Sequence, residues 1–407
     1  MKWKMLFKLG LSVVVIVAVY LFFALQNENN SNKEPQVIPD HQTGQQETSD
    51  HQTGQQEIKS DPLHLSKEPD SQGHVVNTDD KSYRSEAWRN GIHLSLVACG
   101  DRDKESIILL KSAVLFTKTP LVFHIFAELQ LQDYFKRQIE FWPDEYRTKV
   151  EYHIYNLSFP ADEWKKLFKP CASQRLFLPS LLPDVDALLY VDTDILFVRP
   201  LEDIWAFLKK FNSTQLVALS PEHEDSQSSW YHRFARHPFY GELGVNSGVM
   251  LMNLTRIRQS QWLRSLKEYY KEYKLKITWG DQDLINIYFY YYPEQLYVYP
   301  CEWNYRPDHC MYMSVCKGGD RDGASVLHGN RRVMHNDKQP AFKATYDTFV
   351  RHQFGSDLKY EMLVALKREL EKTKHTSCGK VPHIFYRQIE KYTDSLDIYK
   401  NTDNHYG

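Results

Sequence analysis

The amino-acid sequence predicts an α/β domain with a mostly parallel β-sheet flanked by helices. From Ile92 onward, apolar runs typical of strands alternate with longer segments of helical periodicity, which is the pattern of parallel sheets. Polar clusters follow two of the predicted strands, at Cys99–Arg102 and at Asp192–Asp194. Ligands of such sheets bind beyond the carboxyl ends of the strands. The two clusters therefore predict one binding site.

The elements follow one another in a regular order along this region. Short apolar runs rich in β-branched and aromatic residues predict the strands, and apolar residues three or four positions apart predict the helices. The predicted strands are His93–Cys99, Leu121–Ala127, Val150–Leu157, Ala187–Val198 and Gln215–Ser220, and a further apolar strand follows Asn246 and Ser247. The predicted helices are Lys104–Phe116, Cys171–Leu182, Glu202–Phe211, Leu284–Tyr292, Ala341–His352 and Asp357–Lys372.

The beginning of the chain predicts a membrane anchor. Three lysines precede an apolar run over residues 9–25, and together with Leu6 and Phe7 this run has roughly the 20 residues that cross a bilayer. The positive-inside rule makes residues 1–8 a cytosolic tail and puts the rest of the chain in the lumen. A cleaved signal peptide is the alternative, but its apolar core is usually shorter and it ends in a small-x-small site that this sequence lacks.

Composition divides the rest of the chain. Residues 26–88 are polar, contain a duplicated octapeptide, and predict a disordered lumenal stem, because they have too few apolar groups to offset the entropy of ordering. Residues 89–372 are rich in apolar and aromatic groups, enough for one large domain or two fused halves. Residues 373–407 are expected to form a partly disordered C-terminal extension.

Charge and cysteine content limit the possible functions. The net charge of −2 gives no argument for a nucleic-acid partner, and the sequence has neither a P-loop nor a G-x-G-x-x-G motif. Six cysteines in a lumenal chain permit disulfides. Cys301, Cys310 and Cys316 predict a local bridge whose pairing stays open, and their spacing does not match a zinc knuckle. Glycosylation sequons begin at Asn29, Asn156, Asn212 and Asn253.

Two acidic residues interrupt the apolar run Ala187–Val198. Burying an unpaired carboxylate is costly, so a purely structural strand would carry apolar residues there. Residues two apart on a strand point to the same side, about 6.6 Å from each other. Asp192 and Asp194 are therefore predicted to face one Mg²⁺ or Mn²⁺ ion, for which carboxylate oxygens are suitable ligands. The alternative is a polar corner where a strand turns into solvent.

Three later segments carry further candidates. Asn246 and Ser247 precede an apolar strand, either as a plain turn or as polar groups that face a ligand. Asp281 could serve only as a helix N-cap, but that role does not explain the neighbouring Gln282. His328 ends a short apolar run and is the best candidate for a third metal ligand. Basic groups that would suit a diphosphate follow it at Arg331, Arg332 and Lys338.

The Asp-x-Asp strand, Asn-Ser-Gly, Gly-Asp-Gln-Asp and His-Gly-Asn occur here in that order. Together they resemble the retaining glycosyltransferases of family 8, across roughly residues 92 to 350. The resemblance implies a GT-A type, Rossmann-like fold in a single catalytic domain. Within the family, Leu327–Arg332 and Asp337–Pro340 are most similar to the glucoside xylosyltransferases.

The resemblance also implies a role for each candidate. The metal ligands, for Mn²⁺ or Mg²⁺, would be Asp192, Asp194 and His328. The donor would be bound by Val97, Ala98, Cys99, Asp101, Arg175, Asn246, Ser247 and Lys338. The catalytic residues beside the donor sugar would be Asp281 and Gln282. The family usually has Lys-Pro-Trp after the histidine, whereas this chain has Lys338-Gln339-Pro340 at a longer spacing, so Arg331 or Arg332 could replace Lys338.

The implied activity is transfer of xylose from UDP-xylose, with an α1,3 linkage, onto O-linked glucose on EGF-like repeats of Notch-type proteins. The enzyme would be a single-pass type II protein of the endoplasmic reticulum or Golgi membrane. UDP-glucose or UDP-galactose as donor, a binding protein without turnover, and a metal-dependent phosphohydrolase stay open. Retention is hypothesised to follow front-face attack on the oxocarbenium-like sugar, with a covalent adduct on Asp281 as the alternative.

Overall fold

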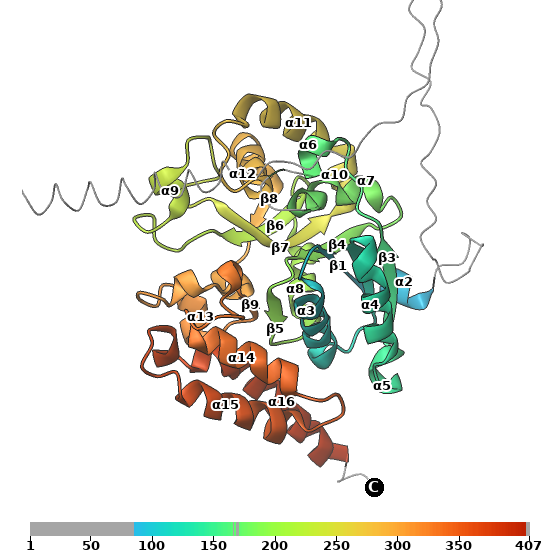
Figure 1. Ribbon diagram of the computed structural model, residues 1–407, viewed down its shortest axis with the longest axis vertical. Helices are drawn as coiled ribbons and strands as arrows, with labels where there is room; N and C mark the ends of the chain where they lie inside the picture. Colours follow the sequence, from blue (N-terminus) through green and yellow to red (C-terminus); the bar gives the residue numbers. More distant parts are fainter. Residues whose placement is uncertain (1–84, 166, 168–170, 404–407) are drawn as a thin grey trace, which may run out of the picture. The chain divides into compact units, whose positions relative to one another are not determined.

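The computed structural model describes residues 85–165, 167 and 171–403. Its centre is a seven-stranded sheet with the order β3-β2-β1-β4-β7-β6-β8 (Figure 1). Strand β7 is antiparallel to both of its neighbours, and all other pairings are parallel. The predicted α/β class with a mostly parallel sheet is confirmed. The strands of this sheet are β1 Ile92–Ala98, β2 Leu121–Ala127, β3 Val150–Tyr155, β4 Ala187–Val191, β6 Val217–Pro221, β7 Val245–Asn253 and β8 Leu296–Val298.

Helices cover both faces of the sheet (Figure 1). On one face, α3 and α4 bury side chains such as Leu109 and Phe135 against the strands. On the other, α7, α10, α11 and α12 do so with side chains such as Leu254 and Trp262. Strands covered on both faces are largely apolar, and every residue of β2, including His124, is buried. These helices are α3 Asp103–Phe116, α4 Leu129–Glu140, α7 Leu178–Leu181, α10 Leu254–Gln259, α11 Trp262–Tyr273 and α12 Asp281–Tyr291.

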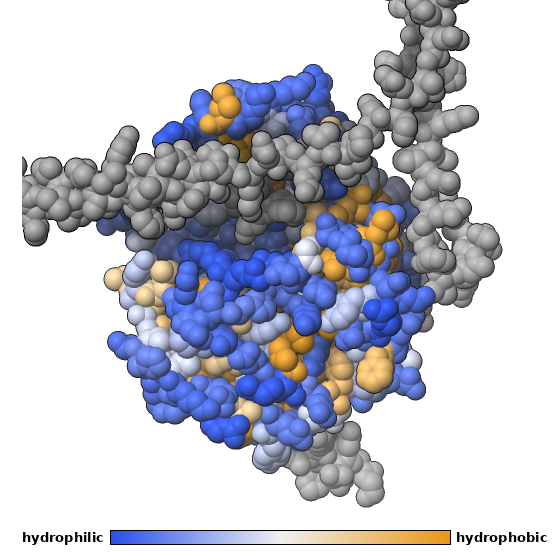
Figure 2. Space-filling view, viewed as in Figure 1, coloured by the Kyte–Doolittle hydropathy of each residue, from blue (hydrophilic) through white to orange (hydrophobic). Residues whose placement is uncertain are grey.

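The hydropathy of the surface is consistent with the burial of apolar side chains against the sheet. In the view of Figure 2 most of the coloured surface is hydrophilic, and apolar atoms form separate small areas. Further short helices lie before β1 and in the connections between strands. They are α2 Glu86–Asn90, α5 Asp144–Arg147, α6 Asp162–Lys165, α8 Leu201–Trp205, α9 Trp230–Phe234 and α13 Lys317–Asp322.

Two predicted helices are less regular than expected. The segment predicted as one helix over Cys171–Leu182 is a 3₁₀ helix, Ala172–Phe177, followed by the single turn of α7. Cys171 has a left-handed φ of 68°, and Pro179 lies in the first turn of α7, where its missing N–H is tolerated. Glu202–Phe211 is likewise α8 followed by a 3₁₀ turn.

The predicted strand Ala187–Val198 is wrong in its middle. Strand β4 ends at Val191, and the chain turns through Asp192–Asp194 before β5, Ile195–Phe197. Strand β5 leaves the main sheet and pairs antiparallel with β9, Val326–His328. The two acids therefore lie in a turn between two sheets, because the strands on either side have different hydrogen-bonding partners.

A third apolar cluster lies beneath the β5–β9 pair. It includes Leu196 and Leu327 from these strands and side chains from α14 Pro340–Arg351, α15 Val364–Glu371 and α16 His383–Asp403. The predicted extension thus contains α16, whose Ile384, Phe385 and Ile389 are fully buried. The predicted division into domains stays a prediction.

The predicted anchor, residues 9–25, and the predicted stem up to residue 84 lie outside the described residues. Among the helices that the structure describes, none has the length and apolar character needed to cross a membrane. Trp88, at the predicted end of the stem, is buried against the rings of His93, His124 and His153.

The packing of α16 leads to a stability prediction. Phe385→Ala should lower the free energy of unfolding by about 3–5 kcal/mol, because it leaves a cavity among buried side chains. Tyr360→Ala, at a position that is 72% exposed, is the control and should change it by less than about 0.5 kcal/mol. Chemical denaturation of both variants measures this, and equal stabilities would contradict the packing of α16.

Candidate functional site

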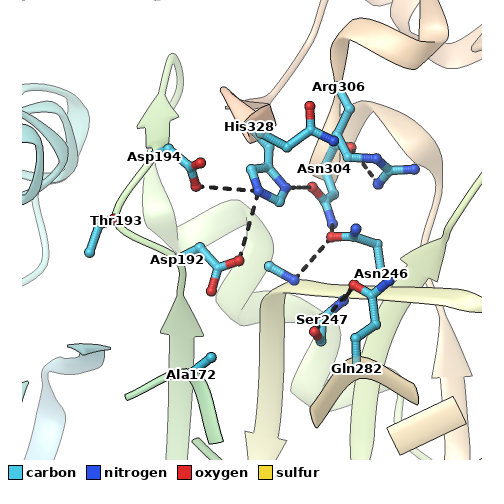
Figure 3. Close-up of polar contacts among 12 residues, drawn as sticks. Ala172, Asp192, Thr193, Asp194, Asn246, Ser247, Gln282, Asn304, Arg306 and His328 are labelled. Carbon is cyan, nitrogen blue, oxygen red and sulfur yellow. Dashed lines mark hydrogen bonds and ion pairs between the residues drawn. The ribbon is translucent and has the colours of Figure 1, made fainter. Parts of the chain in front are cut away.

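The predicted metal ligands meet at the carboxyl edge of the sheet (Figure 3). The Nε2 atom of His328 is 3.3 Å from Oδ1 of Asp194 and 3.8 Å from Oδ2 of Asp192. One ligand atom from each residue lies within 4.8 Å of the other two. This arrangement depends on the pairing of Ile195 with His328 between β5 and β9. The site could hold one divalent cation.

Arg175 joins two acids of the site. Its Nη2 lies 2.8 Å from Oδ1 of Asp192, and its Nε lies 2.6 Å from Oδ2 of Asp281. The guanidinium also lies over the Tyr190 ring, 4.6 Å from its centroid. Burial alone would lower the pKa of Arg175, but the carboxylates of Asp192 and Asp281 raise it. Arg175 therefore stays charged and neutralises part of the negative charge of these acids.

The predicted catalytic pair begins helix α12. Asp281 is buried, and this burial raises the pKa of its carboxyl, while Arg175 acts in the opposite direction. The preceding Gly280 has a φ of 60°, which glycine adopts without steric cost. The Gln282 side-chain oxygen accepts the backbone N–H of Ser247 at 3.1 Å (Figure 3). The helix start is thus attached to the beginning of β7, where Asn246 and Ser247 lie.

The predicted uridine-binding residues lie at the end of β1. Val97 and Ala98 end the strand, and Cys99 follows it in a disulfide with Cys171. This bridge connects the strand end to the segment that carries Arg175. Asp101 is exposed and pairs with Arg332, and this pairing lowers the pKa of its carboxyl.

The loop after β9 carries the predicted phosphate-binding residues. Arg331 and Arg332 both have left-handed φ values, 58° and 60°, which are uncommon outside glycine. Arg331 pairs with Asp308 at 2.7 Å, and Arg332 pairs with Asp101 at 2.6 Å. Lys338 is exposed, and its backbone N–H donates to Oδ1 of Asn336 at 2.9 Å. Its role in binding phosphate stays a prediction.

Two residues of the site, Asn304 and Glu105, were not predicted from the sequence. Asn304 contacts Nδ1 of His328 at 2.9 Å. Glu105, which is buried in α3, accepts the Thr193 hydroxyl at 2.7 Å and fixes the turn between the two aspartates. Glu105 could have been noticed as an acid on the apolar face of a helix. Asn304 belongs to no motif, and no local pattern identifies it.

The cysteines and the remaining acids give no second metal site within residues 85–165, 167 and 171–403. All six cysteines form disulfides, including the predicted local bridge Cys301–Cys316 and the longer Cys310–Cys378. The other two groups with metal-ligand spacing contain these bridged cysteines, whose thiolates are not available as ligands. The zinc alternative is excluded for these cysteines.

The fold resembles that of a solved glycosyltransferase. The structure of galactosyltransferase LgtC in complex with donor and acceptor sugar analogs matches with a TM-score of 0.51 and 15% identity, over 66% of this chain and 99% of that chain. The mostly parallel sheet with helices on both faces is the GT-A fold of such glycosyltransferases. A model of glycosyl transferase family 8 matches residues 93–329. The chain belongs to this family.

Two relatives are similar over most of their length. Glucoside xylosyltransferase 2 of Xenopus laevis is 56% identical over 320 residues, which are 75% of this chain and 75% of the relative. Human glucoside xylosyltransferase 1 is 54% identical over 314 residues, which are 74% of this chain and 71% of the relative. The resemblance predicted from the motifs is confirmed.

A buried polar cluster lies beside the site. Arg306 is fully buried and donates to the backbone oxygens of Pro221 and Glu222. The Oε2 atom of Glu222 and Nε2 of His309 are buried there without a hydrogen-bond partner among the described residues. Burial raises the pKa of Glu222 from 4.5 to about 7. This carboxyl therefore holds its proton to a higher pH in the folded protein than in the unfolded chain.

The raised pKa of Glu222 predicts a pH-dependent stability. Between pH 4.5 and about 7, the unfolded chain loses this proton first, so the free energy of unfolding falls as the pH rises. Because of Glu222, the free energy of unfolding of the unmodified chain should fall by on the order of 2–3 kcal/mol from pH 4 to pH 8. Glu222→Gln should remove this fall. Denaturation at both pH values tests this. The exposed Glu242→Gln is the control, and identical pH dependence of all three proteins would exclude the prediction.

Proposed function

We propose that this chain is a retaining xylosyltransferase that moves xylose from UDP-xylose onto a glucoside. The acceptor is O-linked glucose on EGF-like repeats of Notch-type proteins, and the new linkage is α1,3. The proposal is supported by 54–56% identity to relatives named glucoside xylosyltransferases. The single observation that carries the chemistry is the convergence of Asp192, Asp194 and His328.

The chemistry of these three residues fits a divalent cation such as Mn²⁺. Two carboxylates face an imidazole nitrogen 3.3 and 3.8 Å away, which is a favourable arrangement for oxygen and nitrogen ligands of one ion. Bound there, the cation would neutralise the negative charge that develops on the UDP leaving group. Arg175 would add fixed positive charge beside the same place, since it is already held by Asp192.

The contacts of Asp281 support front-face attack. A double displacement needs a carboxylate that is free to form a bond with the anomeric carbon. Asp281 is 2% exposed and is paired with Arg175 at 2.6 Å, and Gln282 beside it is an amide. In front-face attack the acceptor hydroxyl would instead give its proton to a phosphate oxygen of the departing UDP. Asp281 would then orient Arg175 and would not bond to the sugar.

We also propose that the enzyme acts in the lumen of the endoplasmic reticulum or Golgi, anchored through residues 9–25. Three disulfides support an oxidising compartment. The apolar run after the N-terminal lysines supports a type II orientation.

Loss of one metal ligand should abolish transfer. Asp194→Ala in the full chain should lower kcat/KM for xylosyl transfer by at least about 100-fold, because it removes charge from the site where the leaving group is stabilised. Transfer is measured with Mn²⁺, an O-glucosylated EGF repeat and, in parallel, UDP-xylose, UDP-glucose and UDP-galactose.

Asp394→Ala, which changes a 57% exposed acid on α16, is the matched control and should keep full activity. Normal activity of Asp194→Ala would remove the metal assignment. Preference for UDP-glucose or UDP-galactose would replace the proposed donor, and a trapped glycosyl adduct on Asp281 would replace front-face attack.

A further inference from the structure

The two nitrogens of the His328 ring have different neighbours (Figure 3). Nε2 faces the carboxylates of Asp192 and Asp194. Nδ1 lies 2.9 Å from Oδ1 of Asn304, which is fully buried. A neutral imidazole has one N–H and one lone pair, and the hydrogen bond at one nitrogen decides which of them the other nitrogen presents. The orientation of the Asn304 amide therefore determines whether Nε2 of a neutral His328 presents an N–H or a lone pair to the two acids.

A backbone group determines that orientation. The Gly248 N–H can only donate, and it lies 3.0 Å from the side-chain oxygen of Asn246. The same oxygen lies 2.9 Å from Nδ2 of Asn304, which must therefore be the NH₂ end of that amide. The other end of the amide is the oxygen, so it accepts the N–H at Nδ1 of His328. In the neutral ring the lone pair is then at Nε2, the nitrogen that faces the two acids.

Packing holds the same ring in place. A Cβ atom added to Gly248 would lie 2.2 Å from Cε1 of His328 and 2.7 Å from its Nδ1, so only glycine admits the ring here. The His328 N–H also donates to the backbone oxygen of Tyr305, the residue after Asn304, at 2.8 Å. The disulfide between Cys301 and Cys316 ties the 3₁₀ turn that carries Asn304 to the start of α13.

We propose that Asn304 is a positioning residue for the metal site: it fixes His328 as the Nδ1–H tautomer so that Nε2 can ligate a divalent cation. Partners of this kind behind a ligating histidine commonly tune metal affinity. The chain Gly248–Asn246–Asn304–His328 also links the metal site to the strand that carries Ser247. This inference rests on the metal-dependent transfer proposed above. It assigns Asn246 a role in orienting Asn304.

Two variants of the full chain separate positioning from packing. Asn304→Asp keeps an oxygen acceptor for His328, whereas Asn304→Leu has a similar shape and no acceptor. Mn²⁺ is titrated alone and again with UDP, and free Mn²⁺ is followed by electron paramagnetic resonance. Asn304→Leu should raise the Kd for Mn²⁺ by about 10–100-fold, and Asn304→Asp should raise it clearly less. Thr345→Val, which removes a buried hydroxyl on α14, is the control and should leave Kd unchanged.

A measurement without a variant makes the test independent of folding. In the metal-free protein, ¹⁵N chemical shifts of the His328 ring should report a proton on Nδ1, and an Nδ1 without a proton would overturn the inference. Unchanged Mn²⁺ affinity in a folded Asn304→Leu variant would overturn it too, as would equal losses in both Asn304 variants. Mn²⁺ binding is read without a nucleotide sugar, so absence of xylosyl transfer contradicts the proposed function alone.

Discussion

The pairing of β5 with β9 is the interaction on which the site depends. It places Ile195 opposite His328, and the Gly329 N–H donates to Asp194 O at 2.7 Å. The main sheet alone would put the two acids at its carboxyl edge, but it contains no strand that carries the histidine. Closing the intervening chain costs entropy that a three-residue ladder cannot offset by itself. The buried side chains beneath it, including Leu196, Leu327 and those of α14–α16, supply the remaining stabilisation.

Charge is the second constraint on the site. Three carboxylates, from Asp192, Asp194 and Asp281, lie near one buried arginine and one imidazole. Arg175 compensates part of this negative charge. The carboxylate charge that remains favours binding of a cation. The carboxylates that repel one another here are suitable ligands for a divalent cation, which would assist the proposed departure of a diphosphate.

Local pattern predicted much of the fold, for reasons visible in particular elements. Strand β2 was predicted with its observed bounds, because a strand covered on both faces is a mostly apolar run, which only His124 interrupts here. The helix predicted over Cys171–Leu182 failed because helical periodicity does not reveal the left-handed φ at Cys171. The strand predicted through Asp192 and Asp194 failed because alternation of side chains cannot tell when a chain changes from one sheet to another.

The sequence by itself determined the class of the fold, the family, and the identity of the three candidate ligands, since these depend on short motifs and on apolar patterns that are local. Tertiary structure decided everything that joins distant segments. It paired Cys99 with Cys171 and placed Arg175 in ion pairs with two acids of the site. It also brought Asn304 into contact with Nδ1 of His328. Such contacts depend on packing and on the hydrogen-bond geometry of residues far apart in the chain, which no periodicity along a single sequence encodes.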